Sequence, residues 1–315
     1  MYYFLINPYS RSGRGKRIWK EQIKPILQTR RIPYHAYFSK QAGDMTRLAE
    51  QITDSFMKNH PHTEMCRLIL LGGDGTLNEV VQGIVDFDRV LLGYIPTGSS
   101  NDFARDMGIS KDPVKALLRI LDADQDSPHL MDLGIMETAS YKHSFIVGCG
   151  LGFDAAVCEE VQRSHLKNTL NRIGLGKLTY LGIAVKQLFA AKKVSCEIYL
   201  DQNDEPLQIK RLLFVATMNH RYEGGGFKFC PEADHADGIF DLCVVGNLPK
   251  FLILLGLPTA FFGKHYWIPG IDHYRAKEVQ IRVSAPLWLQ TDGEVHPKTD
   301  SLKLTCFPHR IRFLF

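Results

Sequence analysis

The chain has 315 residues, of which 45% are hydrophobic and 23% charged, a balance typical of a folded globular protein. This length is enough for two ordinary domains, each with its own core. The formal net charge of +4 is too small to indicate a nucleic-acid-binding protein. The longest apolar stretch, residues 251–263, is interrupted by Gly256 and Pro258, so the sequence predicts no membrane span.

The cysteines indicate the cellular compartment of the protein, and the basic residues indicate the kind of ligand that it binds. The seven cysteines are scattered without a CxxC pair, which favours reduced thiols in the cytoplasm over a zinc site or a disulfide framework. Residues 11–31 contain eight Lys or Arg and one acid, and residues 161–193 contain seven and no acid. Such stretches suit phosphate groups or an anionic membrane surface, and solvated helix faces explain them equally well.

The first part of the chain alternates strand and helix signals. Strands are predicted at residues 2–6, 33–39, 67–71 and 90–95, and helices near 18–27, 44–57, 77 onward and 102–107. A basic, glycine-containing loop is expected from Asn7 to Gly15. The alternation predicts a parallel sheet with helices on both faces, and ligands of such sheets bind beyond the carboxyl ends of the strands.

The pattern changes after about Leu130. Short strands are predicted at residues 144–147, 195–200, 211–218, 239–245, 278–283, 288–290, 302–307 and 311–315, with a helical insertion near 154–191. The predicted class is α/β, with an N-terminal parallel-sheet nucleotide domain over residues 1–130. A C-terminal antiparallel β-sandwich domain is predicted over residues 131–315. In an alternative arrangement, its last strand returns to the first domain.

The strongest local motif is the glycine-rich segment Gly72 to Glu79, which follows a strand and opens a helix. Its three glycines let the backbone approach phosphate oxygens, and the helix N-terminus supplies N–H groups. Asp74 would repel bare phosphate, so a cation is expected between them. A tight turn capped by Asp74 is the structural alternative. No Walker A loop occurs in the chain.

Two further polar segments follow predicted strands. Residues 96–105 contain Ser99, Ser100 and Asn101, which can bind a nucleotide or cap the next helix. The loop from Asn7 to Gly15 is a plausible phosphate cradle, although a solvated loop would look alike.

Together these three motifs resemble the catalytic domain of the diacylglycerol kinase superfamily, which includes sphingosine and ceramide kinases. The likeness extends over nearly the whole chain and is greatest to the soluble bacterial lipid kinases. It implies ATP as the phosphoryl donor, Mg²⁺ as the metal, and a lipid alcohol at a membrane surface as the acceptor. It also implies a cytoplasmic protein peripheral to the membrane, and relatives of this type are often homodimers.

The resemblance carries nucleotide contacts onto matching positions of this chain. The expected ATP-binding residues are Asn7, Ser10, Ser12, Gly13, Ser39, Gly72, Gly73, Asp74, Gly75, Thr76, Leu77, Asn78, Ser99 and Asn101. Ser39 and Ser99 stand where the family usually has threonine, which keeps the hydroxyl. The loop at Ser10 to Gly13 departs from the tighter family pattern, because Arg11 precedes Ser12.

The resemblance also places catalytic and metal-binding residues late in the chain. Glu294 would be the general base in the Thr291–Glu294 segment, with Asp292 and Asp74 completing the catalytic group. A second, structural Mg²⁺ would be held by the side chains of Asp234 and Asp237 and by the Ile239 carbonyl. An Asp-Gly hairpin turn is the plain alternative for both late segments.

Three other features have bland explanations that compete with functional ones. Gly148 to Phe153 has the wrong spacing for a dinucleotide motif and is expected to be a tight strand-to-helix connection. The twelve histidines form no ligand spacing. Residues 251–268 combine aromatic and basic side chains, which favours a membrane interface, with core packing as the alternative for most of them.

The predicted activity is ATP-dependent phosphorylation of a lipid hydroxyl, with diacylglycerol giving phosphatidic acid as the favoured reaction. The alternative is a NAD kinase or another small-molecule kinase of the same superfamily. Asn101 to Arg105 and the late Asp-Gly-Glu sequence argue against that alternative. A nucleotide-binding regulator without catalysis would be expected to lack Asp74 or Glu294, and both are present.

Overall fold

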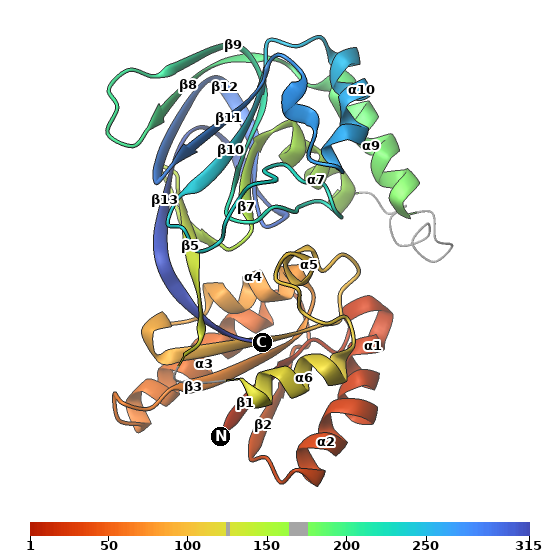
Figure 1. Cartoon of the computed structure of the whole chain (residues 1–315), viewed down its shortest axis with the longest axis vertical. Coiled ribbons are helices and arrows are strands. Elements are labelled where there is room, and N and C mark those ends of the chain that lie inside the picture. The colour runs from red at the N-terminus through yellow and green to blue at the C-terminus, as the bar shows by residue number, and fades with distance from the viewer. Residues whose placement is uncertain (124–126, 164–175) are drawn as a thin grey trace. The chain divides into compact units, whose positions relative to one another are not determined.

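The computed structural model describes residues 1–123, 127–163 and 176–315. The chain forms two compact units (Figure 1). Unit 1 contains residues 1–133, 235–237 and 307–315, and unit 2 contains residues 134–234 and 238–306.

Unit 1 is built on a parallel sheet with strand order β2-β1-β3-β4. Its strands are β1 (Tyr2–Ile6), β2 (Tyr34–Phe38), β3 (Cys66–Gly72) and β4 (Val90–Pro96). The end of β13 (Glu294–Leu314) joins this sheet, because Arg312 to Leu314 pair in parallel with Leu91 to Gly93 of β4. Apart from Arg67, the two central strands β3 and β4 are apolar and buried along their length, as expected for a sheet covered on both faces.

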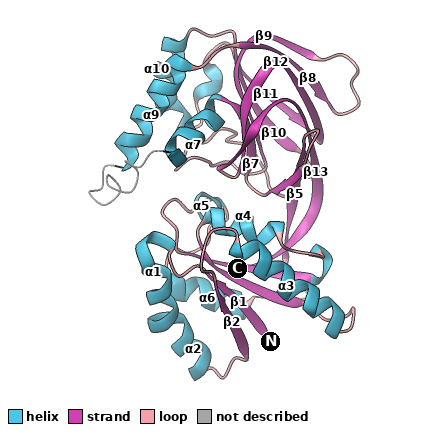
Figure 2. Cartoon of the chain, turned by 180° about the vertical axis from the view of Figure 1, so that it is seen from behind, coloured by secondary structure: helices cyan, strands magenta, loops and turns pink. Residues whose placement is uncertain are grey.

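Two groups of helices cover the sheet of unit 1. They comprise α1 (Ser10–Ile18), the π-helical turn η1 (Trp19–Ile23), α2 (Lys24–Thr29), α3 (Asp44–Asn59), α4 (Asp74–Gln82), the 3-10 turn η2 (Phe87–Arg89), α5 (Asp102–Asp106) and α6 (Pro113–Asp122). α3 packs on α4, whereas α6 packs on β4 and η1. Figures 1 and 2 show these two groups on opposite faces of the sheet, which confirms the predicted α/β class of the N-terminal part.

The loop predicted from Asn7 to Gly15 is mostly helical. α1 already begins at Ser10, so only three residues separate it from β1. Gly15 permits this early start, because a Cβ atom there would lie 2.2 Å from the carbonyl oxygen of Asn7. The helix therefore packs directly against residues 7–9. The predicted loop is too long, because this close contact through Gly15 is not visible in the sequence.

Unit 2 is an antiparallel sheet structure with helices on one side, which confirms the predicted sandwich-like class. Its strands are β5 (His129–Glu137, shared with unit 1), β6 (Lys142–Phe145), β7 (Gly148–Gly152), β8 (Val194–Leu200), β9 (Leu207–Met218), β10 (Phe240–Gly246), β11 (Ile271–Ala276), β12 (Glu278–Thr291) and most of β13. Its helical segments are α7 (Phe153–Arg163), α9 (Gly176–Ala190), α10 (Lys250–Ala260) and the 3-10 turn η3 (His265–Trp267).

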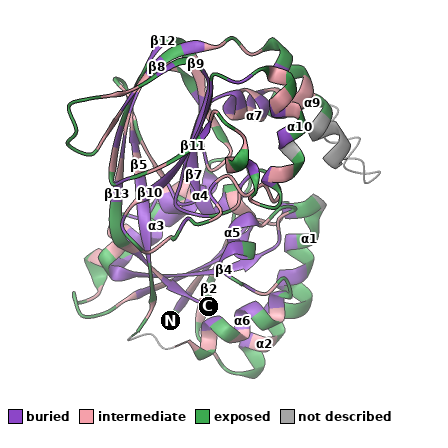
Figure 3. Ribbon diagram, turned by 45° about the horizontal axis from the view of Figure 1, so that its top comes forward, coloured by how far each residue is buried: buried purple, intermediate pink, exposed green. Residues whose placement is uncertain are grey.

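Strands β9 and β12 are each long enough to pair with two neighbours in succession. β12 pairs with β8 through residues 279–283 and with β7 through residues 289–291. β9 likewise pairs first with β8 and then with β7. The parts of β9 and β12 that pair with β7 are buried, whereas the parts that pair with β8 contain both buried and exposed residues (Figure 3).

Several predicted strand boundaries are wrong in unit 2. The strands predicted at 278–283 and 288–290 form one strand, β12, whose pairing register shifts between Arg282 and Leu287 where Pro286 interrupts the pattern. The two last predicted strands likewise form the single strand β13. Gly148 to Gly152, expected to be a connection, is itself a strand that leads straight into α7.

The helical insertion predicted near 154–191 is present as α7 and α9. Part of the acid-free basic segment 161–193 lies outside the described residues. Among the helices that the structure describes, none is long and apolar enough to cross a membrane.

Candidate active site

The loops that follow the parallel strands of unit 1 gather the predicted nucleotide residues. β1 and β3 end side by side, since Ile6 pairs with Leu71, and β3 ends beside β4, since Gly72 pairs with Pro96. Carboxyl ends of parallel strands form the ligand-binding edge of such a sheet.

Hydroxyl and amide side chains join these loops to one another. Asn7 donates a hydrogen bond from Nδ2 to Oγ1 of Thr76 at 3.0 Å, and its Oδ1 accepts one from the Tyr9 backbone N–H. The Ser10 and Thr97 hydroxyls lie 2.7 Å apart and are buried. Four of these residues follow three different strands, so the first, second and third sequence motifs meet at one edge of the sheet.

Two glycines bring the β3 and β4 loops into backbone contact. A Cβ atom at Gly98 would lie 2.7 Å from Cα of Gly73, and one at Gly73 would lie 3.1 Å from Cα of Gly98. The Thr97 backbone N–H also donates to the Gly72 carbonyl oxygen at 2.7 Å. Side chains at these two glycines would push the loops apart, which explains why glycine is required there.

The N-terminus of α4 faces open space beside this contact. The helix begins at Asp74 after the extended residue Gly73, and Gly75 is exposed with no neighbouring atom within 4 Å of a Cβ position. The first N–H groups of an α-helix lack partners within the helix and carry the positive end of its dipole. This is a suitable place for the phosphate groups of a nucleotide.

Asp74 lies at the start of α4 and touches the start of α5. Its Oδ2 accepts a hydrogen bond from the Asp102 backbone N–H at 3.0 Å, and the Tyr94 hydroxyl lies 3.5 Å from Oδ1. Burial, and then the charge of Asp74, raise the pKa of Tyr94 well above its ordinary value, so Tyr94 remains a neutral donor. The carboxylate is thus held in place by two elements.

The remaining predicted nucleotide residues occupy different settings. Asn101 has a left-handed backbone (φ 51°) and donates from Nδ2 to the Gly98 carbonyl oxygen, so it shapes its own loop. Ser99 is exposed on that loop, whereas Ser39 is buried with its N–H bonded to Ile6. Leu77 and Asn78 are buried within α4, and Gly13 lies inside α1 together with Ser12.

Glu79, the last residue of the glycine-rich motif, has a structural role. Its Oε2 accepts hydrogen bonds from the backbone N–H groups of Gly43 and Met45 at 3.0 and 3.2 Å. It therefore caps the start of α3 from α4. The Asp44 carboxylate accepts from Lys40 and Gln41, and these backbone hydrogen bonds lower its pKa.

In unit 2, Asp292 and Gly293 form the two-residue turn between β12 and β13. Both have left-handed backbones (φ 51° and 83°), and the flanking residues Thr291 and Glu294 pair across the hairpin. This geometry is that of the tight hairpin turn for which Asp-Gly is favoured.

The Asp292 carboxylate anchors this turn to the neighbouring strand. It accepts hydrogen bonds from the backbone N–H groups of Ile146, Val147 and Gly148 at 2.9, 2.8 and 3.0 Å. The Asp292 N–H in turn donates to the Gly148 carbonyl oxygen at 2.9 Å. Both carboxylate oxygens thus hold the turn in position.

A buried glutamine fixes the same turn from the other side. Gln290 accepts a hydrogen bond at Oε1 from the Gly293 N–H at 2.7 Å. Its Nε2 donates to Asp154 at 3.1 Å and to Glu223 at 2.7 Å. Burial raises the pKa of Asp154 to about 6, because an apolar setting disfavours the charged form. Gly150 makes room for this group, since a Cβ there would lie 1.8 Å from Oδ2 of Asp154.

Glu294 extends from this turn with its side chain about half exposed. Its carboxylate lies 3.7 Å from Nε2 of His143, whose ring packs edge-on to His296 at 4.6 Å. Burial lowers the pKa of His143, which Glu294 only partly opposes, and burial lowers the pKa of His296 to about 4. Both rings are therefore neutral near pH 7, so neither His143 nor His296 offers Glu294 a positive charge.

The chain matches two protein-family models. Residues 1–133 match the diacylglycerol kinase catalytic domain, and residues 148–315 match the YegS C-terminal NAD kinase beta sandwich-like domain. A diacylglycerol kinase of Bacillus subtilis is 30% identical over 297 residues, which cover 92% of this chain and 88% of the relative. The chain belongs to the diacylglycerol kinase family.

Solved structures confirm the two-part fold. A diacylglycerol kinase from Bacillus anthracis strain Sterne aligns with a TM-score of 0.70 at 21% identity, over 99% of this chain and 96% of that chain. An NAD kinase from Archaeoglobus fulgidus in complex with ATP aligns with a TM-score of 0.52 at 8% identity, over 100% of this chain and 94% of that chain. The predicted family, fold class and lipid kinase type of enzyme are confirmed, and ATP is the donor that such a kinase implies.

The residues that motif reasoning missed in this kinase are Gln290, Asp154, His143 and His296. Gln290 is separated by 136 residues from Asp154 and by 67 from Glu223. The histidines form no ligand spacing in the sequence, so their pairing beside Glu294 is not predicted. Gln290 and His296 carry one local signal, since both flank the Asp-Gly turn, whereas Asp154 and His143 lie far from it in the sequence.

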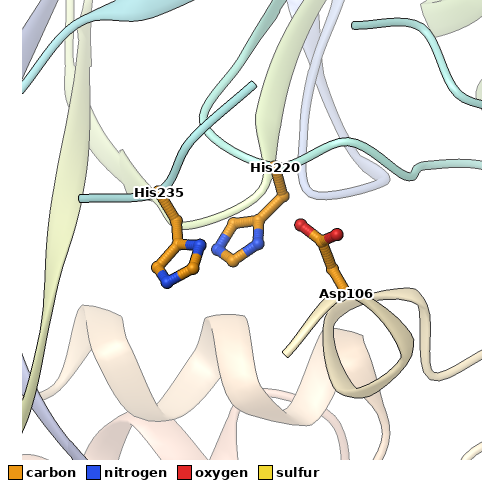
Figure 4. Close-up of side chains that lie close together, drawn as sticks. All are labelled: Asp106, His220 and His235. Atoms are coloured by element: carbon orange, nitrogen blue, oxygen red, sulfur yellow. The ribbon is translucent and has the colours of Figure 1, made fainter. Parts of the chain in front are cut away.

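The predicted metal ligands Asp234, Asp237 and Ile239 lie on the loop before β10, where Gly238 has a left-handed backbone (φ 80°). They remain a prediction. Figure 4 shows Asp106, at the end of α5, and His235 on a segment of unit 1, together with His220 of unit 2. Within unit 1, the Nε2 atoms of His235 and His129 lie 2.8 Å apart.

Proposed function

We propose that this kinase transfers the γ-phosphoryl group of ATP to the hydroxyl group of diacylglycerol and so produces phosphatidic acid. The observation that carries the proposal is the half-exposed Glu294 carboxylate on a turn that Asp292 and Gln290 hold from two sides. Fixed placement of a proton acceptor is what a loose phosphoryl-transfer transition state demands from the protein. Family membership supports the lipid kinase class.

The ATP phosphates would bind at the N-terminus of α4. Gly72, Gly73 and Gly75 let the phosphate oxygens approach the backbone, and the helix dipole favours their charge. Asn7, on the loop after β1, is hydrogen-bonded to Thr76 in the first turn of α4, and Ser10, the first residue of α1, is hydrogen-bonded to Thr97 on the loop after β4. In this arrangement Ser39, Ser99 and Asn101 are the further nucleotide contacts that we propose.

The residues of this chain suit Mg²⁺, which prefers oxygen ligands. Asp74 offers a carboxylate beside the proposed phosphate position, and the carboxylates of Asp234 and Asp237 with the Ile239 carbonyl offer a second oxygen set. Bound Mg²⁺ would neutralise charge on the phosphate oxygens. Asp74, held by the Asp102 N–H, would orient that ion relative to α4.

Glu294 would act as the general base. As a bond forms between the lipid hydroxyl oxygen and the γ-phosphorus, the hydroxyl proton passes to the Glu294 carboxylate. The bond between the γ-phosphorus and the β,γ-bridging oxygen breaks, and ADP leaves with that oxygen. Asp292 contributes by holding the turn rather than by proton transfer, since three backbone N–H groups occupy its carboxylate.

The test is transfer of labelled γ-phosphate from Mg-ATP to a panel of diacylglycerol, phosphatidylglycerol, a sphingoid base, an undecaprenol-like alcohol and NAD. We expect labelled phosphatidic acid from the wild type and its loss in Asp74→Ala. Labelled NADP without any labelled lipid would instead establish the NAD kinase alternative, whose fold this chain shares.

A further inference from the structure

Helix α10 of unit 2 is apolar on all sides. Of its eleven residues, Lys250 alone is charged. One side packs into the unit, since Ile253 and Ala260 are buried and a Cβ at Gly256 would lie 2.5 Å from Cδ1 of Ile268. A helix apolar around its whole circumference is normally buried on every side or faces lipid.

The other side of α10 is exposed. Phe251 and Leu255 are 58% and 69% exposed, and Phe262 in the turn after the helix is 73% exposed. Their spacing of four and seven residues places them on one side. Trp267, at the end of η3, is 83% exposed and is the most exposed of the large hydrophobic side chains that the structure describes.

Neighbouring elements extend this surface. Lys250 donates from Nζ to the carbonyl oxygens of Phe189 and Ala191, which places the exposed Phe189 at the end of α9 next to the start of α10. Phe261 is exposed and stacks on Phe227 with ring centroids 4.0 Å apart. We call the following six residues the α10 face: Phe189, Phe251, Leu255, Phe261, Phe262 and Trp267.

Exposed hydrophobic residues are ordinary when they are single, but a group of this kind marks a binding surface. The α10 face holds six of the twelve large hydrophobic side chains that are exposed among the described residues. Five of the six are aromatic, and aromatic rings are the side chains that favour the boundary between water and lipid.

The surroundings of the α10 face are basic. Lys192, Lys193, Lys250, Lys264 and Arg211 lie on or next to its elements. The Asn247 N–H donates to the Arg211 carbonyl oxygen, and Lys193 donates from Nζ to the Leu248 carbonyl oxygen just before α10. Burial, followed by the charges of Arg211 and Lys250, lowers the pKa of Lys193.

No acid offsets these cations in the sequence. Residues 246–271 and 161–196 contain neither Asp nor Glu. Each Lys or Arg close to an anionic lipid surface adds attraction, whereas an apolar protein partner would need no such excess of positive charge. The length of α10 excludes a span, because eleven residues extend about 16 Å and a bilayer core needs about 20 residues.

We infer that the α10 face docks this kinase onto bilayers that contain anionic lipid, with α10 lying in the plane of the interface. Phe251, Leu255 and Trp267 would enter the headgroup region while the exposed Lys192 and Lys264 contact lipid phosphates. The inference rests on the proposed function for the reason to dock, since the acceptor is a lipid. The docking itself needs neither ATP nor catalysis.

The test is sedimentation of the full chain with phosphatidylcholine vesicles, with and without phosphatidylglycerol, in the absence of ATP. We expect binding that requires the anionic lipid and weakens with salt. The triple variant Phe251→Ser, Leu255→Ser, Trp267→Ser should bind at least about tenfold more weakly. The matched control is Phe38→Ser with Val85→Ser, two exposed hydrophobic residues of unit 1, which should bind like the wild type.

Trp267 gives a second readout, because Trp19 is buried and only Trp288 is otherwise partly exposed. Brominated lipids should quench the fluorescence of the wild type, and this quenching should vanish in Trp267→Phe while sedimentation persists. Unchanged sedimentation of the triple variant would overturn the inference. So would loss of a concentration-dependent dimer in that variant with vesicle binding intact, which would assign the face to a second copy of the chain.

A water-soluble, short-chain diacylglycerol separates docking from catalysis. The triple variant should phosphorylate it at the wild-type rate while losing activity on vesicle-bound diacylglycerol. If the wild type binds anionic vesicles through the α10 face but phosphorylates no lipid in either form, docking stands and the proposed function fails. If the variant loses both activities equally, the face serves the fold or the site, and docking is refuted.

Discussion

The phosphate end of unit 1 and the Glu294 turn of unit 2 are held in place by different means. In unit 1, consecutive loops touch through glycines and short polar side chains, and the key contacts involve backbone atoms of Gly73 and Gly98. In unit 2, the turn depends on Gln290 and Asp292, whose partners lie as far as 146 residues away. Motifs that follow predicted strands therefore mark the first region in the sequence, whereas no local motif marks the distant partners of the second.

Among substitutions that act by displacing the site, the largest effect on the rate is expected at the glycine contact. Gly98→Ala places a methyl group 2.7 Å from Cα of Gly73, where only backbone can move away. A shift of about 1 Å in a positioned site costs about 10²-fold in rate. We expect a loss of this size in phosphoryl transfer with weaker ATP binding, measured by steady-state kinetics and calorimetry.

The control for crowding is Gly182→Ala, because a Cβ at Gly182 meets no atom within 4 Å. It should leave both ATP binding and the rate unchanged. Normal ATP affinity in Gly98→Ala would show that the contact between the two loops does not shape the nucleotide site.

A smaller effect is expected from Gln290→Met, which keeps the volume but removes three hydrogen bonds around the turn. Misplacement of Glu294 should lower kcat about 10–100-fold, with KM for ATP unchanged because ATP is proposed to bind in unit 1. Gln280→Met, an exposed change on the same strand, should behave as wild type. If folded Gln290→Met keeps the wild-type kcat, the hydrogen bonds of Gln290 are not needed to position Glu294 for catalysis.

The smallest expected effect concerns the stability of unit 2 as a function of pH. The folded-state pKa of Asp154 is about 6, above its ordinary value of 3.8, so the folded state holds this proton more tightly than the unfolded state. Its stability contribution is therefore complete below pH 4 and is lost as pH rises to about 6. Asp154→Asn should gain about 1–3 kcal/mol relative to wild type between those values, measured by urea unfolding. A difference independent of pH would mean that Asp154 is ionised throughout.

The sequence predicts the fold class, the family and most strands, because alternation and periodicity are local signals. It fails where tertiary contacts override them. Gly148 to Gly152 resembles a connection, yet it is a strand whose Gly150 makes room for Asp154 and Gln290. Pro286 resembles a strand end, yet β12 continues through it with a change of register.

The site divides in the same way. Asn7, Gly72 and Thr76 could be singled out because their motifs follow predicted strands. His143 and Asp154 could not, since nothing near them in the sequence records that the sheet brings them to the Glu294 turn. The exposure of Phe251 and Trp267 could not be predicted from the sequence either, because the same apolar and aromatic residue types occur in cores and at interfaces.

The most direct test of the central claim is the rate of lipid phosphorylation by Glu294→Gln, with ATP affinity measured on the same preparation. Glu205→Gln, an exposed glutamate in the loop between β8 and β9, is the control and should match the wild type. Loss of a positioned base should lower the rate about 10²–10⁴-fold while ATP binds as before. A Glu294→Gln enzyme that phosphorylates lipid at the wild-type rate would contradict the assignment of Glu294 as the base.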